Sequence, residues 1–209
     1  MGSYSFQNVD QFMYLGSVVS CGNRISLEIS QRIVKANRCY FGLSKHLRSS
    51  AISRSTKCLL YKTLIRPVLT YGSESWTLTS NEEKELLIFE RKVLRRIFGP
   101  VKVGNSWRRR TNREVYELYK DGDLMKYIKL GRLRWAGHVA RMPEERIPRR
   151  VLDGRLYQNR GRGRPRLRWE DAVVRDARIL LHTRNWRATA QDRANWRRLI
   201  EEAKDHTGL

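Results

Sequence analysis

The sequence predicts a mainly α-helical protein, with a short β-hairpin at its N-terminus followed by two clusters of helices. From Ile25 onward, apolar residues recur every three or four positions, which is the period of a helix with one buried face. β-prone residues gather between Val9 and Val19, where Gly16-Ser17 offers a turn. Because 40% of the 209 residues are hydrophobic, the chain has enough apolar surface to bury a core.

Capping residues and breakers set the expected limits of the first helices. A helix with Ser26 as its N-cap carries an apolar stripe to Leu47. A second helix follows Ser53, and Pro67 should kink or end it because proline lacks a backbone donor. Its expected buried face is Leu60, Leu64, Val68 and Tyr71. The third helix should begin with a capping box of Ser80 and Glu83, bury Leu86, Phe89, Val93 and Ile97, and end at Gly99.

The second half of the chain is expected to contain helices separated by basic segments. In chain order we expect a basic loop at 107–110, helices at 111–120 and 124–142, an Arg-rich arm within 146–168, and helices at 170–181 and 189–204. The last helix should bury Ala190, Trp196, Ile200 and Ala203. A domain boundary is expected between Gly99 and Thr111. The predicted regions are 1–23, 24–104 and 105–209.

Charge narrows the choice of partner. Lys and Arg number 43 against 21 Asp and Glu, a net charge of +22. Such a charge opposes compaction, and a polyanion relieves the repulsion, so DNA or RNA is the expected partner class, with an anionic membrane surface as the alternative. No apolar run is long enough to span a membrane, and the first residues lack the pattern of a secretory signal. Three widely spaced cysteines fit reduced thiols in an intracellular protein, nuclear or cytoplasmic.

The sequence offers no set of residues for metal-dependent or nucleophilic catalysis. Polymerases and nucleases need several carboxylates that converge on metal ions. Asp121 and Asp123 fit better as turn formers, and Glu170-Asp171 as charges at a helix N-terminus. The four histidines are not at ligand spacing to one another or to cysteine. We therefore expect no catalytic residues, no metal and no cofactor.

Arginines interleaved with glycines and tryptophans are the candidates for nucleic-acid binding. Guanidinium groups bind phosphates bidentately, and indoles stack on bases, although tryptophan in a helical protein also packs in the core. Arg162-Gly163-Arg164-Pro165 resembles the core of an AT-hook, which lies in AT-rich minor grooves; the alternative is a solvated basic loop. The predicted nucleic-acid-binding residues are Arg108, Arg109, Arg110, Arg132, Arg134, Trp135, Arg160, Arg162, Arg164, Arg166, Arg168 and Trp169.

Five segments together resemble the C-terminal part of the reverse transcriptases of non-LTR (LINE-type) retrotransposons. In chain order they are Phe12–Ser17 with Glu28-Ile29, Arg32-Ile33 and Ala36; Leu60–Gly72 with Ser75-Trp76; Leu94–Ile97; Arg132–Met142; and Gly163–Asp171. The resemblance covers about residues 9–205. It implies the end of a polymerase palm, a thumb-like helical bundle and a basic C-terminal extension, which in such enzymes grip template, primer and element RNA.

The departures from that family decide the expected function. The family's catalytic aspartates lie upstream of the block at Tyr14-Leu15-Gly16, and the chain has no counterpart to them, to the endonuclease or to a Cys/His knuckle. We therefore expect a truncated, catalytically inactive reverse-transcriptase fragment that binds nucleic-acid backbones without sequence preference. Two alternatives stay open: a thumb subunit acting in trans with a separate palm or ribonucleoprotein, and a gene remnant without function.

Overall fold

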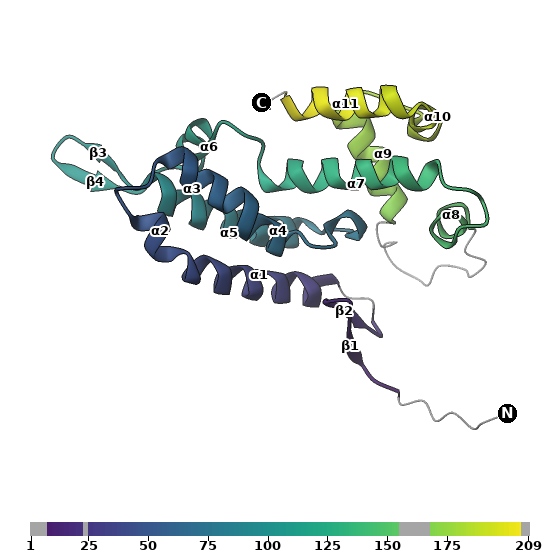
Figure 1. The fold of residues 1–209 in the computed structure, drawn as a ribbon, viewed down its shortest axis with the longest axis horizontal. Helices are drawn as coiled ribbons and strands as arrows, with labels where there is room; N and C mark the ends of the chain where they lie inside the picture. Colours follow the sequence, from purple (N-terminus) through teal and green to yellow (C-terminus); the bar gives the residue numbers. More distant parts are fainter. Residues whose placement is uncertain (1–7, 23–24, 155–167, 206–209) are drawn as a thin grey trace. The chain divides into compact units, whose positions relative to one another are not determined.

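The computed structural model describes residues 8–22, 25–154 and 168–205 (Figure 1). The predicted class is confirmed, because an antiparallel hairpin at the N-terminus is followed by helices. The chain divides into two compact units. Unit 1 is Met1–Gly72 with Leu78–Thr111, and unit 2 is Ser73–Thr77 with Asn112–Leu209. A boundary after residue 104 would have cut a second hairpin that belongs wholly to unit 1.

The N-terminal hairpin pairs β1 (Gln11–Tyr14) with β2 (Ser17–Ser20), so that Phe12 lies opposite Val19. Both turn residues, Leu15 and Gly16, have positive φ angles of 46° and 82°. Glycine adopts this conformation without strain, which explains its place in the turn. Most of the hairpin's large apolar side chains are exposed, and Leu15 keeps 75% of its surface in solvent.

The hairpin turn is fastened to the first helix by a buried ion pair. Glu28 accepts the N–H of Val18 at 2.6 Å and bonds Arg32 at 2.5 Å, and Arg32 in turn donates to the carbonyl of Gly16 at 2.7 Å. Both charged side chains are at least nine-tenths buried. The Tyr71 hydroxyl donates to the carbonyl of Leu15 at 3.0 Å. The hairpin turn, the first turns of α1 and Tyr71 thus hold one another in place.

Unit 1 places its remaining helices around one core. These are α1 (Ile25–Gly42), α2 (Ser44–Arg48), α3 (Arg54–Leu60), the π-helical turn η1 (Tyr61–Ile65), α4 (Arg66–Leu69) and α5 (Ser80–Phe98). The helix expected from Ser26 to Leu47 is therefore two helices, α1 and α2, and Ser26 lies within the first turn rather than at the N-cap.

The buried face of the α3–η1–α4 segment differs from the predicted one. The structure buries Lys57, Tyr61, Ile65 and Leu69 instead of the set built on Leu60. These residues repeat every four positions, and four residues overshoot a 3.6-residue turn by about 40°. The wider π turn at 61–65 compensates for this drift and keeps the four on one side. Pro67 then stands in the first turn of α4, where its missing N–H costs little.

Helix α5 confirms its predicted stripe, and its cap is shifted by one residue. The capping box is formed by Thr79, whose hydroxyl accepts from the N–H of Glu82, while Glu82 accepts the N–H of Thr79. The predicted stripe from Leu86 to Ile97 is buried, and Gly99 ends the helix with φ 70°. The expected basic loop that follows is a hairpin of β3 (Val101–Val103) and β4 (Ser106–Arg108).

Unit 2 is built around α7 (Leu124–Ala140), which contacts most other elements of the unit. The others are η2 (Ser73–Ser75), α6 (Asn112–Tyr119), α8 (Ile147–Asp153), α9 (Trp169–Leu180), α10 (Trp186–Gln191) and α11 (Arg193–Asp205). The expected buried residues Ala190, Trp196, Ile200 and Ala203 are confirmed in this core. They come from two helices instead of one, because the chain breaks at Asp192.

Close approach of α11 to α7 depends on a glycine. The indole Nε1 of Trp196 donates to the carbonyl of Leu133 at 3.1 Å, and a Cβ added to Gly137 would lie 2.2 Å from that nitrogen. Helix α7 therefore presents bare backbone where the largest side chain of the interface packs. Of the helices that the structure describes, none combines the length and apolarity needed to cross a bilayer.

Candidate nucleic-acid interface

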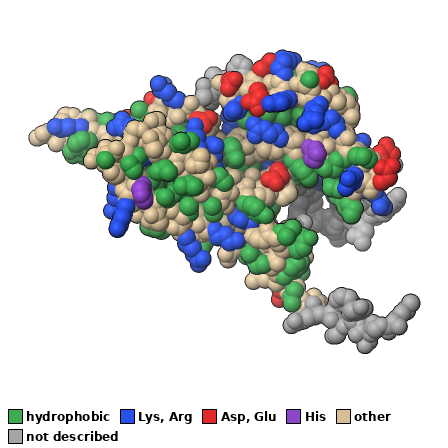
Figure 2. Space-filling view, in the orientation of Figure 1, with side chains coloured by type: hydrophobic (Ala, Val, Ile, Leu, Met, Phe, Trp, Pro, Cys, Tyr) green, Lys and Arg blue, Asp and Glu red, His purple; other side chains and the backbone are tan. Residues whose placement is uncertain are grey.

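Charge is distributed differently in the two units. In unit 2, acidic side chains stand among the basic ones, as Figure 2 shows over α11, where red and blue are interspersed. Ion pairs in this unit join Arg113–Glu117, Arg132–Asp176, Arg134–Glu201, Arg149–Asp153, Arg187–Asp153, Arg187–Glu170 and Arg198–Glu202. A run of arginines in the sequence is thus no measure of the charge available to a ligand.

Arg132 is the clearest correction among the predicted binding residues. Its side chain is 3% exposed, one guanidinium nitrogen lies 2.5 Å from Asp176 Oδ2, and another donates to the carbonyl of Trp76 at 2.9 Å. If Arg132 left this pair to reach a phosphate, the buried Asp176 would keep only its 3.7 Å contact with Arg175. The prediction that Arg132 contacts phosphate is therefore wrong, and the residue joins α7, α9 and the 73–77 segment.

The opposite face of α7 carries predicted residues that stay in solvent. Arg134, Trp135 and His138 are exposed, and the Trp135 and His138 rings lie 5.5 Å apart with a tilt of 46°. Arg134 approaches Glu201 of α11 at 3.7 Å, with both side chains half exposed. A contact of that length in water is weak, so it leaves Arg134 available to an anion.

Helix α11 continues this surface with residues that the sequence analysis did not select. Arg193, Arg197 and Arg198 line a shallow hollow together with Ala194 and Glu201. Among the residues that the structure describes, neither Arg193 nor Arg197 pairs with a carboxylate. The spacing of Arg193 and Arg197, one turn apart on an otherwise polar face, was the available signal in the sequence.

One contact and one electrostatic effect connect the arginines in and just after α7 with those of α11. Arg134 of α7 lies 3.7 Å from Glu201 of α11. Arg141, directly after α7, is affected by the positive charge of Arg193 on α11. Burial first, and then the charge of Arg193, lower the pKa of Arg141. We call this surface the α7–α11 face, made up of Arg134, Trp135, His138, Arg141, Arg193, Arg197 and Arg198. Its cations repel one another, so a bound anion would stabilise it.

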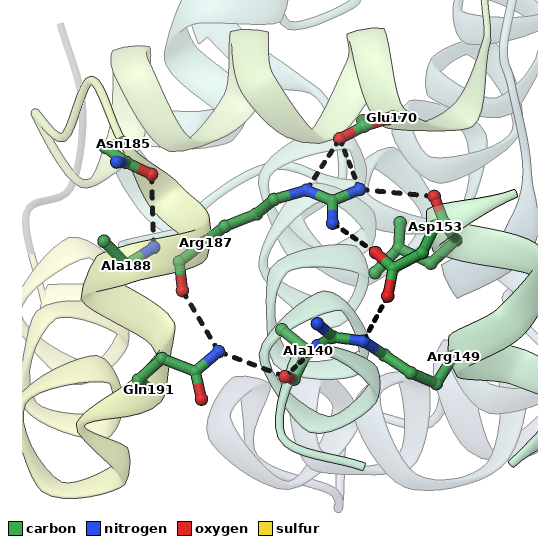
Figure 3. Close-up of polar contacts among 9 residues, drawn as sticks. Ala140, Arg149, Asp153, Glu170, Asn185, Arg187, Ala188 and Gln191 are labelled. Atoms are coloured by element: carbon green, nitrogen blue, oxygen red, sulfur yellow. Dashed lines mark hydrogen bonds and ion pairs between the residues drawn. The ribbon is translucent and has the colours of Figure 1, made fainter. Parts of the chain in front are cut away.

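A cluster of ion pairs around Arg187 in unit 2 connects the residues on the two sides of the Arg-rich segment. Arg187 of α10 bonds Asp153 at the end of α8 at 2.5 Å, Glu170 at the start of α9 at 2.8 Å, and the carbonyl of Leu152 at 3.2 Å (Figure 3). Arg149 also bonds Asp153, at 2.5 Å. Arg187 therefore joins residues on both sides of the segment 155–167, and we call this set of contacts the Arg187 clasp.

The charges of the clasp support one another. Hydrogen bonds from Arg187 and Arg149, together with their charges, hold the pKa of Asp153 below its usual range despite the opposing effect of burial. For Arg187, burial lowers the pKa, but the hydrogen bonds and charges of Asp153 and Glu170 outweigh it and raise the pKa overall. Both shifts favour the charged forms of Asp153 and Arg187.

Of the five arginines predicted in the arm, Arg168 is the one among the described residues. Arg160, Arg162, Arg164 and Arg166 lie outside the described residues. Arg168 is exposed, and its backbone N–H donates to Asp171 at 3.0 Å.

Trp169, in contrast, is partly buried against the core of unit 2, and its indole donates to the carbonyl of Glu74 at 2.7 Å. Its predicted role in base stacking is corrected to packing, because the ring faces protein and its N–H already has a partner.

The three arginines expected in a basic loop, Arg108, Arg109 and Arg110, differ in exposure around the β3–β4 hairpin. Arg108 and Arg109 are exposed, beside Trp107 with 67% of its surface in solvent. Arg110 is half-buried, and its guanidinium donates to the carbonyls of Gly99 at 3.1 Å and Pro100 at 3.4 Å. Arg110 thus closes the base of the hairpin, which corrects its assignment as a phosphate contact.

The acidic residues weighed as catalytic candidates have structural partners. Asp123 caps α7 by accepting the N–H of Lys126 at 2.8 Å, and Asp121 accepts the N–H of Gly122 at 2.8 Å. Glu170 belongs to the Arg187 clasp. Within residues 8–22, 25–154 and 168–205, no three His, Cys, Asp or Glu side chains come together in a way that could hold a metal ion.

Fold and surface together define a class: a mainly helical, strongly basic protein of two compact units. The chain is 29% identical over 199 residues to an uncharacterized transposon-derived protein of Caenorhabditis elegans, across 92% of this chain and 71% of that protein. This similarity supports a transposon origin for the chain. No family model matches the sequence, and no solved structure matches it.

Proposed function

We propose that this chain binds the phosphate backbone of nucleic acids without sequence preference, as a catalytically inactive fragment of a non-LTR retrotransposon reverse transcriptase. The single observation that carries the binding proposal is the α7–α11 face, where Arg193 and Arg197 are exposed without a carboxylate partner beside the half-exposed Arg134. Contacts of this kind follow charge and spacing and do not distinguish one base from another.

The Arg187 clasp adds a second argument. A segment rich in arginine loses conformational entropy when it binds, and anchoring both of its ends in one place reduces that loss. Asp153 and Glu170 provide this anchoring without using any of the arginines between them. The segment with Arg160, Arg162, Arg164, Arg166 and Arg168 would therefore act with the α7–α11 face in binding phosphates.

The decisive experiment is the salt dependence of binding, measured by fluorescence anisotropy on unrelated DNA, RNA and hybrid duplexes. Each lost phosphate contact on DNA lowers the log–log salt slope by about 0.9. We expect Arg193→Gln with Arg197→Gln to lower the slope by about 2. The matched control, Arg113→Gln on α6 with Lys120→Gln directly after it, removes the same charge and should leave the slope within about 0.5. Absence of binding, or binding without salt dependence, would refute the proposal.

The Arg-rich segment is tested separately. Changing all five arginines to Gln should lower the slope by a few units, at most about 4.5, and leave the circular dichroism spectrum unchanged. Stronger binding to AT-rich duplexes would favour the AT-hook-like interpretation. A loss of helicity would instead indicate that the five arginines form ion pairs within the protein.

Catalytic inactivity is proposed because no convergent carboxylates stand among the described residues. Primer extension and nuclease assays with Mg²⁺ or Mn²⁺ should give only background. Incorporation that disappears on Asp121→Ala or Asp123→Ala would contradict this.

The exposed N-terminal hairpin favours a second candidate function. The chain would be a subunit that packs against a separately encoded polymerase palm and completes it. Phe12 and Met13 keep 51% and 58% of their surface in solvent, and a two-stranded sheet is not self-sufficient. Phe12→Ser with Met13→Ser should reduce self-association in analytical ultracentrifugation and abolish restoration of primer extension to an added palm. Unchanged association would remove this argument.

A further inference from the structure

The strongest feature outside the surface described above lies in unit 1, where α1 and α5 bring two aromatic rings and two cations together. Tyr40 is buried, whereas its neighbour Phe41 keeps 62% of its surface in solvent. Their ring centroids lie 5.3 Å apart in an edge-to-face arrangement. The buried ring thereby supports the exposed one from the side and leaves the outer part of Phe41 open to a ligand.

Helix α5 places Lys92 and Arg96 beside these rings. Lys92 Nζ lies 5.2 Å from the centroids of both Tyr40 and Phe41, and donates to Asn37 at 2.9 Å. Arg96 Nε donates to the Tyr40 hydroxyl at 3.2 Å. Both cations are exposed, and among the described residues no carboxylate pairs with either. A lysine has three donors, so most of its hydrogen-bonding capacity remains for an anion.

We infer that this cluster, the Phe41 site (Asn37, Tyr40, Phe41, Lys92 and Arg96), binds an unpaired nucleotide strand, with one base stacked on Phe41 and neighbouring phosphates on Lys92 and Arg96. The two cations are one helical turn, about 6 Å, apart along α5, a span within reach of successive phosphates of one strand. Stacking of a base on an exposed ring beside a basic groove is how sequence-tolerant single-strand binding is achieved. In a duplex the base faces are already covered, so the ring selects unpaired strands.

Charge supports this occupant over a protein. Unit 1 has 19 Lys and Arg against 6 Asp and Glu, a net charge of +13, and the charged side chains visible over α1 and α2 in Figure 2 are blue. Protein-binding surfaces, in contrast, are depleted in lysine. The inference rests on the proposed function, since both require nucleic-acid binding. It adds a second site, in the other unit, with a preference for unpaired strands.

The test compares a single-stranded oligonucleotide carrying 2-aminopurine with the same sequence as a duplex. Phe41→Leu preserves apolar bulk and removes the ring. We expect it to weaken single-strand binding about ten-fold, to abolish quenching of the 2-aminopurine, and to change duplex binding less than two-fold. Leu59→Ala, an exposed apolar residue of α3, is the matched control and should change neither. Lys92→Gln should lower the single-strand salt slope by about 0.7.

Each other outcome is decisive. Single-strand affinity retained by Phe41→Leu, or equal losses on both probes, overturns the Phe41 site while leaving the proposed function intact. If the unaltered chain binds neither probe, the proposed function fails as well. Circular dichroism of each variant shows that a loss of binding is not a loss of folding.

Discussion

Gly137→Ala should destabilise unit 2 although it replaces glycine by the best helix former. The added Cβ would lie 2.2 Å from Nε1 and 2.5 Å from Cδ1 of Trp196, a side chain that is 2% exposed and has no free space to move into. Overpacking of this kind costs about 1–3 kcal/mol, and loss of the bond to the Leu133 carbonyl about 1 kcal/mol more. The gain in helix propensity returns about 1 kcal/mol.

The expected net loss is therefore about 1–3 kcal/mol, or a fall of at least about 5 °C in the unfolding midpoint of a unit of this size. Gly131→Ala is the matched control on the same helix, because a Cβ there meets nothing within 4 Å. It should stabilise by about 0.5–1 kcal/mol. Thermal unfolding followed by circular dichroism and tryptophan emission measures both. If Gly137→Ala is as stable as the unaltered chain, the close packing of Trp196 on α7 is wrong.

Three further substitutions test the other buried or capped contacts. Arg132→Met should cost up to about 3–5 kcal/mol, because the buried Asp176 would keep only its 3.7 Å contact with Arg175, and it should not lower the salt slope of binding; a lowered slope in a folded variant would restore Arg132 as a phosphate contact. Thr79→Ala should cost about 1 kcal/mol in urea unfolding, and no cost would contradict the capping box. Because the folded pKa of Asp153 is depressed, its contribution to stability is present above about pH 4 and is lost as the pH falls through the folded value. Asp153→Asn should reduce the dependence of the thermal unfolding midpoint on pH between pH 5 and about 2. An unchanged dependence would show that the Asp153–Arg187 ion pair does not stabilise the fold.

Local signals predicted the helices well and failed where two registers compete. The stripe of α5 was predictable because its apolar residues stand between a capping box and a glycine. The α3–η1–α4 segment offered two four-residue repeats one position apart, and Tyr61 with Ile65 packs as well as Leu60 with Leu64. Nothing local indicates a π turn, so the tertiary core decided between them.

The β3–β4 hairpin, in contrast, has a local signal in the sequence. Gly104-Asn105 stands between two short β-prone runs, and such a dipeptide is typical of a tight hairpin turn.

The candidate site was less predictable than the fold because its decisive contacts join residues far apart in the chain. Arg132 and Arg134 stand two positions apart in one basic motif, yet the first is buried and the second is half exposed. The difference depends on Asp176, 44 residues further along, which no local pattern connects to α7. The clasp is similar, since Arg187 joins Asp153 and Glu170 across the Arg-rich segment.

Both units carry a large positive charge, so attraction to a polyanion does not depend on the Arg-rich segment alone. Unit 2 has 24 Lys and Arg but also 15 Asp and Glu, a net charge of +9, whereas unit 1 carries +13. Removing the five arginines of the arm leaves +17 of the +22. Because long-range attraction follows net charge, that variant should still associate with nucleic acid, and more slowly in high salt. Within each unit, the exposed cations stand on helices, Lys92 and Arg96 on α5 and Arg193 and Arg197 on α11, and a helix holds such side chains at a fixed spacing for phosphates.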